Sequence, residues 1–114
     1  MADCLFCKIL AGDIPADKVY EDDKSFAFND INPQAPHHVL IIPREHIESL
    51  NQVDESNEAL IGHLCAVASK IAKDLGVSEG GYRTVFNTNK DAGQEVFHIH
   101  LHLLAGRKLS WPPG

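Results

Sequence analysis

Three histidines recur at every second position near the end of the chain, in the segment Phe97-His98-Ile99-His100-Leu101-His102-Leu103-Leu104. Side chains two residues apart in a β-strand point to the same face of the sheet. The spacing therefore predicts a strand that presents the three imidazoles on one surface and turns the intervening apolar residues towards a core. A helix would scatter the imidazoles and leave the leucines without a common face.

Imidazoles this close together titrate near neutral pH and oppose one another's protonation. A neutral imidazole beside a proton-bearing one supplies a nucleophile and a proton donor, as phosphoryl transfer through a covalent intermediate requires. Strand His-x-His pairs also bind catalytic zinc, so His98, His100 and His102 could instead hold a metal with an open position for water. Three solvated or core histidines are the third interpretation.

Two further groups of residues suit a ligand. Asn87 and the pair Gly93-Gln94 precede the histidine row, and glycine lets backbone N–H groups approach phosphate oxygens, although ordinary turns have the same composition. Cys4-Leu5-Phe6-Cys7 has the spacing that lets two thiolates bind one tetrahedral metal, unless the cysteines pack as small hydrophobes.

The elements that must position these residues follow from periodicity and chain breaks. We expect a helical turn from Cys4 to Gly12, a hairpin around Tyr20 and Phe26–Phe28, and a buried strand His38–Ile42. A long amphipathic helix is expected over Asp54–Leu75, capped by Asp54 and stopped by Gly76, with Cys65 in its apolar stripe and His63 facing solvent. Strands over Tyr82–Asn87 and Val96–Leu104 complete an α+β fold with a five-stranded antiparallel sheet.

Length, composition and charge limit the possible domain number, partners and location. The 114 residues, 44% of them hydrophobic, suffice for a single domain, 1–114, with a C-terminal tail over 106–114. The longest aliphatic run, Val39–Ile42, cannot span a bilayer, and the net charge of −6 disfavours a long nucleic acid or anionic membrane as partner. Three cysteines and the lack of a secretory leader predict a reducing, cytoplasmic location.

The row His98-Ile-His100-Leu-His102-Leu-Leu matches the signature of the histidine triad (HIT) family, and the chain resembles its Hint branch from end to end. The similar segments are Phe6-Cys7-Lys8-Ile9, Ile14-Pro15-Ala16, Asp30-Ile31, Pro33-Gln34-Ala35-Pro36, Gly93-Gln94 and Trp111-Pro112-Pro113-Gly114. The resemblance implies a homodimer that joins two sheets, with a site on each subunit for a purine nucleotide or nucleoside phosphoramidate.

The resemblance also assigns roles to residues. His100 would form a nucleotidyl-histidine intermediate with His102 and His38 beside the phosphate. Asp30 would bind the ribose, and Phe6, Ile9, Phe28, Ile31 and Leu40 would enclose the base, although core packing explains Ile9 and Leu40 nearly as well. Asn87, Gly93 and Gln94 would hold the phosphate, Glu95 and Val96 would also belong to the nucleotide site, and Trp111 would reach the neighbouring subunit's site. Glu95 replaces the serine of animal Hint proteins and leaves the leaving-group preference open.

Some histidine triad proteins pair Cys-x-x-Cys with the histidine of a Pro-x-x-His segment and the first triad histidine. The resemblance therefore implies a structural zinc site of Cys4, Cys7, His46 and His98, in which His98 orients the catalytic residues rather than reacting, with no catalytic metal. The expected activity is hydrolysis of the P–N bond of purine nucleoside phosphoramidates. The alternatives are a dinucleoside polyphosphate hydrolase, the zinc hydrolase described above and a non-catalytic nucleotide-binding dimer.

Overall fold

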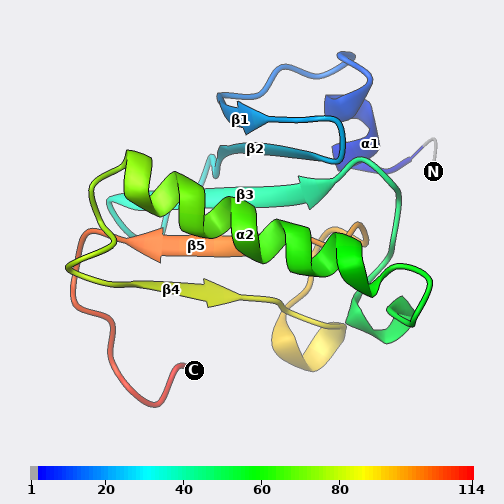
Figure 1. Cartoon of the computed structure of the whole chain (residues 1–114). Helices are drawn as coiled ribbons and strands as arrows, with labels where there is room; N and C mark the ends of the chain where they lie inside the picture. Colours follow the sequence, from blue (N-terminus) through cyan, green and yellow to red (C-terminus); the bar gives the residue numbers. More distant parts are fainter. Residues whose placement is uncertain (1–2) are drawn as a thin grey trace.

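The computed structural model describes residues 3–114 and contains the expected α+β fold (Figure 1). The helices are α1 (Leu5–Leu10) and α2 (Glu58–Asp74), and short 3-10 turns cover Leu50–Gln52 and Lys90–Ala92. The strands are β1 (Lys18–Glu21), β2 (Ser25–Asn29), β3 (His37–Pro43), β4 (Tyr82–Val85) and β5 (Leu101–Ala105). They form one antiparallel sheet in the order β1-β2-β3-β5-β4, which confirms the predicted fold class.

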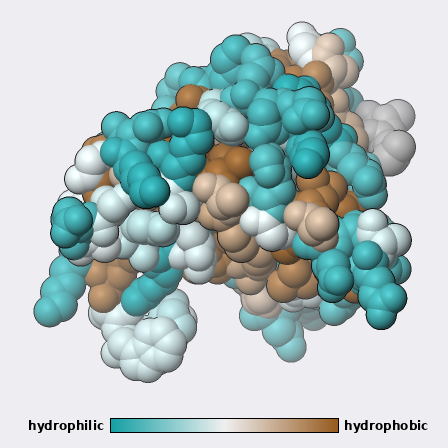
Figure 2. Space-filling model, in the orientation of Figure 1, coloured by the Kyte–Doolittle hydropathy of each residue, from teal (hydrophilic) through white to brown (hydrophobic). Residues whose placement is uncertain are grey.

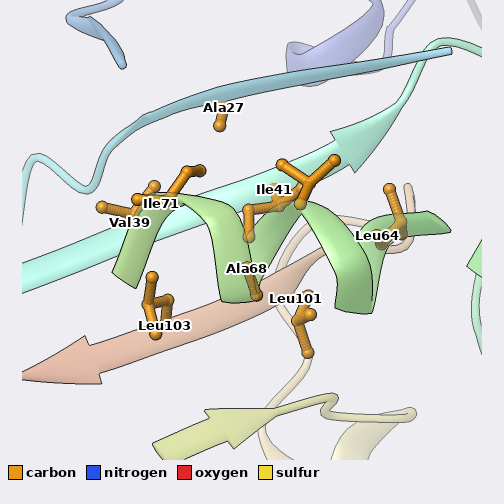
Figure 3. Packing of buried hydrophobic residues seen from close by; sticks show 9 residues of the cluster. Ala27, Val39, Ile41, Leu64, Ala68, Ile71, Leu101 and Leu103 are labelled. Atoms are coloured by element: carbon orange, nitrogen blue, oxygen red, sulfur yellow. The ribbon is translucent and has the colours of Figure 1, made fainter. Parts of the chain in front are cut away.

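Helix α2 covers one face of the sheet and buries the larger apolar cluster (Figures 1 and 3). Its residues Leu64, Val67, Ala68 and Ile71 pack on alternate residues of three strands, namely Ala27, Val39, Ile41, Leu101 and Leu103. The two-residue period of the strands sends the intervening side chains to the opposite face. There Phe28, Leu40 and Ile42 pack against Phe6 of α1 in a second cluster. His38 of β3 and His102 of β5 lie on this second face.

The final strand is shorter than the sequence predicts, because it begins at Leu101 rather than at Val96. In the β3–β5 ladder Ile41 pairs with Leu101, so a longer strand would set Ile99 opposite Pro43, where β3 ends. Proline has no N–H to donate to a ladder. The backbone N–H of Ile99 donates instead to the carbonyl of Ile47. His98 and His100 therefore lie before the strand, and the prediction of three imidazoles on one pleated face was wrong.

The long helix also differs from its prediction at two points. It begins at Glu58 because Asp54 forms a turn of its own, with its carboxylate accepting hydrogen bonds from the backbone N–H and hydroxyl of Ser56. Cys65 is exposed rather than in the core. His63, expected to face solvent, is half-buried, and its Nε2 lies 2.8 Å from a carboxylate oxygen of Asp22.

The surface of the α2 side is mixed in character. Figure 2 shows hydrophobic side chains between hydrophilic ones across the face that carries this helix. Among the described residues, no helix is both long and apolar enough to cross a membrane. The segment 106–114 forms no helix or strand, and Arg83 of β4 holds it through a hydrogen bond from its guanidinium to the carbonyl of Ser110.

Candidate active site

A cavity of about 490 Å³ opens on the sheet face opposite α2, and this volume suits a small molecule. Its apolar walls come from α1 and from the middle of β2 and β3, namely Phe6, Ile9, Phe28, Leu40 and the fully exposed Ile31 at the mouth. The rings of Phe6 and Phe28 meet edge to face, with centroids 5.5 Å apart. The polar side is lined by Asp30, His38, Asn87, Glu95, His100 and His102.

His100 presents an unprotonated nitrogen in this cavity. Its Nδ1 lies 2.8 Å from the backbone carbonyl of His98, and a carbonyl can only accept, so Nδ1 carries the proton. The Nε2 atom of the neutral ring consequently keeps its lone pair. Burial lowers the pKa of His100, although the hydrogen bond to His98 and the charge of Asp30 partly oppose this shift. A buried neutral imidazole with a free lone pair is suited to nucleophilic attack.

A second chain of hydrogen bonds fixes the protons of His38 and His102. The backbone N–H of Gln34 donates to Nδ1 of His38 at 3.0 Å, so the proton of the neutral ring lies on Nε2. This Nε2–H points at Nδ1 of His102, 2.9 Å away, and the proton of His102 must therefore lie on Nε2. The chain ends with a proton donor in the ring that lies beside His100, at a centroid distance of 5.1 Å.

Both rings of this chain are neutral at pH 7. Burial lowers the pKa of His38, with Asp30 opposing the shift, and burial together with the neighbouring His100 and His38 lowers that of His102 to about 4. The Oδ2 atom of Asp30 lies 3.4 Å from His38 Nε2, and Oδ1 accepts a hydrogen bond from the backbone N–H of Asn32. Asp30 thus places a carboxylate beside two uncharged imidazoles.

Beside the cavity, four potential metal ligands converge, namely Cys4, Cys7, His46 and His98. Nδ1 of His98 lies 3.5 Å from each thiol sulfur, while Nδ1 of His46 lies 3.3 Å from Cys7 Sγ and 3.2 Å from the His98 nitrogen. His98 is fully buried and its Nε2–H donates to the carbonyl of Pro43 at 2.8 Å, which leaves an Nδ1 lone pair aimed at the cluster.

This donor set fits a zinc ion. Zinc takes thiolate and imidazole ligands in a tetrahedral arrangement, with bonds of about 2.3 and 2.0 Å, and such bonds set neighbouring ligand atoms about 3.3–3.8 Å apart. Burial raises the pKa of the Cys7 thiol, as does the adjacent Cys4, and a bound dication would offset this cost by favouring the thiolate.

Comparison with known proteins decides the family. The HIT domain model matches residues 11–109. This chain belongs to the histidine triad family. It is 51% identical over 105 residues to the purine nucleoside phosphoramidase of Escherichia coli strain K12, covering 92% of this chain and 88% of that protein. A solved HIT family hydrolase from Legionella pneumophila is 54% identical, with a TM-score of 0.96 and coverage of 98% of this chain and 100% of the other.

A second solved histidine triad protein, from Clostridium difficile, is 47% identical with a TM-score of 0.93, and the match covers 96% of both chains. An uncharacterised HIT-like protein of Synechococcus elongatus is 51% identical over 112 residues, which cover 98% of this chain and 97% of its own. The agreement therefore extends over the elements that build the site, including α1 and the segment before β5.

In this histidine triad protein the residues expected at the nucleotide divide into two groups. Most of them line the cavity, including Asn87, Gly93 and Val96. Gln94 does not, because its buried side chain accepts a hydrogen bond from the backbone N–H of Asn89 and donates to the carbonyls of Glu48 and Val96. It shapes the loop in which Gly93 takes a positive φ of 81°. Trp111 is 80% exposed and lies outside the cavity.

Five cavity residues were not predicted from the sequence: Leu5, Ile14, Pro15, Asn32 and Gln34. Three of them fall inside segments that match the Hint branch, which was the available signal for Ile14, Pro15 and Gln34. The contribution of Gln34 to the histidine chain comes from its backbone N–H, and such a role has no signature in side-chain chemistry.

The geometry does not favour a catalytic metal on the triad. The ring of His98 faces the cysteines, and Nδ1 of His100 is occupied by the His98 carbonyl, so the three rings do not converge on one point. A second set of ligand atoms comes from Asp30, His38 and His102. A metal on Nε2 of His38 would displace its proton while Gln34 donates to Nδ1, which would require an imidazolate anion.

Proposed function

We propose that the protein is a hydrolase that cleaves the P–N bond of purine nucleoside phosphoramidates through a nucleotidyl intermediate on His100. The observation that carries the proposal is the free Nε2 lone pair of His100, fixed by the His98 carbonyl inside a cavity of nucleotide size. The activity named for the E. coli relative supports the choice of substrate.

The reaction has two displacements at phosphorus. In the first, Nε2 of His100 forms a bond to the α-phosphorus while the P–N bond breaks, and the departing nitrogen takes a proton from solvent and leaves as the amine. The Nε2–H of His102 donates a hydrogen bond to a phosphate oxygen as charge develops there. In the second, water attacks the phosphorus and loses a proton to solvent while the His100–phosphorus bond breaks, so that the nucleoside monophosphate and free enzyme result.

The remaining residues bind and orient the nucleotide. The ribose hydroxyls donate hydrogen bonds to Asp30, whose carboxylate lies in the cavity. The base packs between the apolar side chains of the cavity, such as Phe6 and Phe28, and Asn87 with the backbone at Gly93 holds the phosphate oxygens. His98 acts through its backbone carbonyl, which keeps the proton of His100 on Nδ1.

Rapid quench with an adenosine phosphoramidate labelled at phosphorus tests the mechanism. We expect label on the wild-type protein within one turnover, stable in base and lost in acid, and none on His100→Ala, which still binds AMP. Undiminished turnover by His100→Ala would refute the mechanism. AMP binding without any labelled wild-type protein would instead indicate a non-catalytic nucleotide-binding protein. Faster cleavage of a dinucleoside polyphosphate would move the protein to that class of hydrolase.

We further propose that zinc occupies the four-ligand cluster. When bound, it neutralises the two thiolates and ties α1 to the segment before β5. Metal analysis should find about one zinc per chain in the wild type and in Cys65→Ser, the matched control with an exposed cysteine, and much less in Cys7→Ser. Equal zinc content in all three proteins would contradict the site. Reduced, metal-binding cysteines agree with the cytoplasmic location that we infer.

We also infer a homodimer in which two sheets join through β4. This strand lies at an edge of the sheet, so one row of its backbone groups has no strand partner among the described residues. Tyr82 on β4 and Trp111 in the tail are exposed aromatics near this edge, and the α2 face carries further apolar surface (Figure 2). Sedimentation equilibrium should give twice the mass of one chain, and the monomer mass at micromolar concentration would contradict the dimer.

A further inference from the structure

A second cavity, of about 390 Å³, adjoins the proposed nucleotide cavity. The two share three lining residues, Leu5, Glu95 and Val96. Phe97, an exposed aromatic, forms part of the outer wall of the second cavity, and His46 of the metal cluster lies in another part. A substrate larger than a mononucleotide could therefore extend from one cavity into the other past the side chain of Glu95.

The in-line geometry of phosphoryl transfer indicates which part of the substrate would do so. The attacking Nε2 of His100 and the leaving nitrogen must lie on opposite sides of the phosphorus. The base and ribose are expected against Phe6, Phe28 and Asp30, on the side where α1 meets β2 and β3. The shared wall at Glu95 and Val96 is then available to the leaving group.

The charged side chains known to line this passage are acidic. Among residues 3–114, the second cavity is lined by three carboxylates, those of Asp3, Glu48 and Glu95, and by no lysine or arginine. A zinc ion bound by two thiolates and two neutral imidazoles adds no net charge, so it would not compensate them. Glu95 is the member that also lines the nucleotide cavity, on the wall that the two cavities share.

We propose that Glu95 determines leaving-group specificity and selects amines that carry an additional positive charge, such as diamines. This inference rests on the proposed phosphoramidase function. The Glu95 carboxylate attracts the cationic end of the amine as the P–N bond breaks and repels anionic leaving groups such as a second nucleotide. The negative charge of Glu95 thereby determines which phosphoramidates the site accepts.

Three adenosine 5′-phosphoramidates of equal chain length test the proposal, with the amine ending in an ammonium, a methyl or a carboxylate group. In the wild type at low salt, we expect kcat/KM to fall in that order, with about threefold to tenfold between the first two. Glu95→Gln should reduce this ratio to within about twofold, and 0.5 M NaCl should shrink it in the wild type because salt screens the charge. Glu79→Gln, the same substitution outside both cavities, should keep the wild-type ratio.

Binding to an inactive variant tests the role of Glu95 independently of turnover. Calorimetry on His100→Ala should show the ammonium compound binding more tightly than the methyl compound, and the added Glu95→Gln substitution should abolish the difference. Such binding without wild-type turnover would refute the phosphoramidase function and uphold the role of Glu95. Equal kcat/KM for the three compounds, or a preference that survives Glu95→Gln, would overturn the role of Glu95 while the activity stands.

Discussion

The hydrogen bond from His38 to His102 provides the sharpest test of the site. His38 is buried, and it donates to His102 at 2.9 Å while accepting from the Gln34 backbone at 3.0 Å. His38→Leu keeps the volume but removes the donor. His38→Gln places an amide N–H near the position of Nε2 and so can still donate. If His38 acts by holding the proton of His102 on Nε2, the two variants should differ strongly in kcat.

The size of the difference follows from the buried bond. Leaving the Nδ1 acceptor of His102 without its partner costs about 1–3 kcal/mol. At about 1.36 kcal/mol per factor of ten, the expected loss in kcat for His38→Leu is about 5-fold to 150-fold. The loss should be small for His38→Gln, and KM should change little in both because base and ribose contacts remain.

Steady-state kinetics on an adenosine phosphoramidate measures these constants, and nitrogen-15 NMR reads the tautomer of His102 directly. We expect the Nε2–H form in the wild type and in His38→Gln, and a mixture of forms in His38→Leu. Equal kcat for both variants, or an unchanged His102 tautomer in His38→Leu, would refute the reasoning. The NMR result stands even if the protein proves to have a different substrate.

Two further predictions concern stability. Asp22→Ala should lower the free energy of unfolding by about 2–4 kcal/mol in urea titration, because the Asp22 carboxylate accepts five hydrogen bonds, including two from the fully buried Ser25. Asp23→Ala, at an exposed position, should change it by less than about 0.5 kcal/mol. Equal effects of the two substitutions would contradict this role of Asp22. Because burial lowers the pKa of His102 to about 4, the folded state binds fewer protons than the unfolded state between pH 6.5 and 4. The free energy of unfolding should therefore fall as the pH drops through that range and stay level between pH 7 and 8. A constant free energy of unfolding down to pH 4 would contradict a buried neutral ring at His102.

Local periodicity was sufficient to predict most of the fold. The long apolar repeat of α2 indicates a helix buried along one side, and the unbroken aliphatic run of β3 indicates a strand buried on both faces. Periodicity does not locate the edge of a buried stripe. Leu64 and Cys65 are adjacent and both apolar, yet the helix turns about 100° between them, and Leu64 faces the sheet while Cys65 is exposed.

The limits of β5 depend on its partner strand rather than on its own residues. The segment from Val96 has the alternation of a strand, but a strand forms only where a neighbour can pair with it. Pro43 ends that possibility opposite Ile99. Likewise, no sequence pattern revealed that Gln34 sets the proton of His38, because the donor is a backbone N–H placed by a turn.

The late start of β5, at Leu101 rather than at Val96, has a chemical consequence for the whole site. Had the strand continued to Val96, His98 and His100 would have shared a face, and their backbone groups would have been engaged in the ladder. Freed from the ladder, His98 turns its ring to the cysteine cluster while its carbonyl accepts the Nδ1–H of His100. The ring is held on both sides, by the Pro43 carbonyl and by the cluster ligands. The carbonyl that selects the tautomer of the nucleophile therefore belongs to a residue with little freedom to move, and the two-residue spacing serves to link two centres rather than to line one surface.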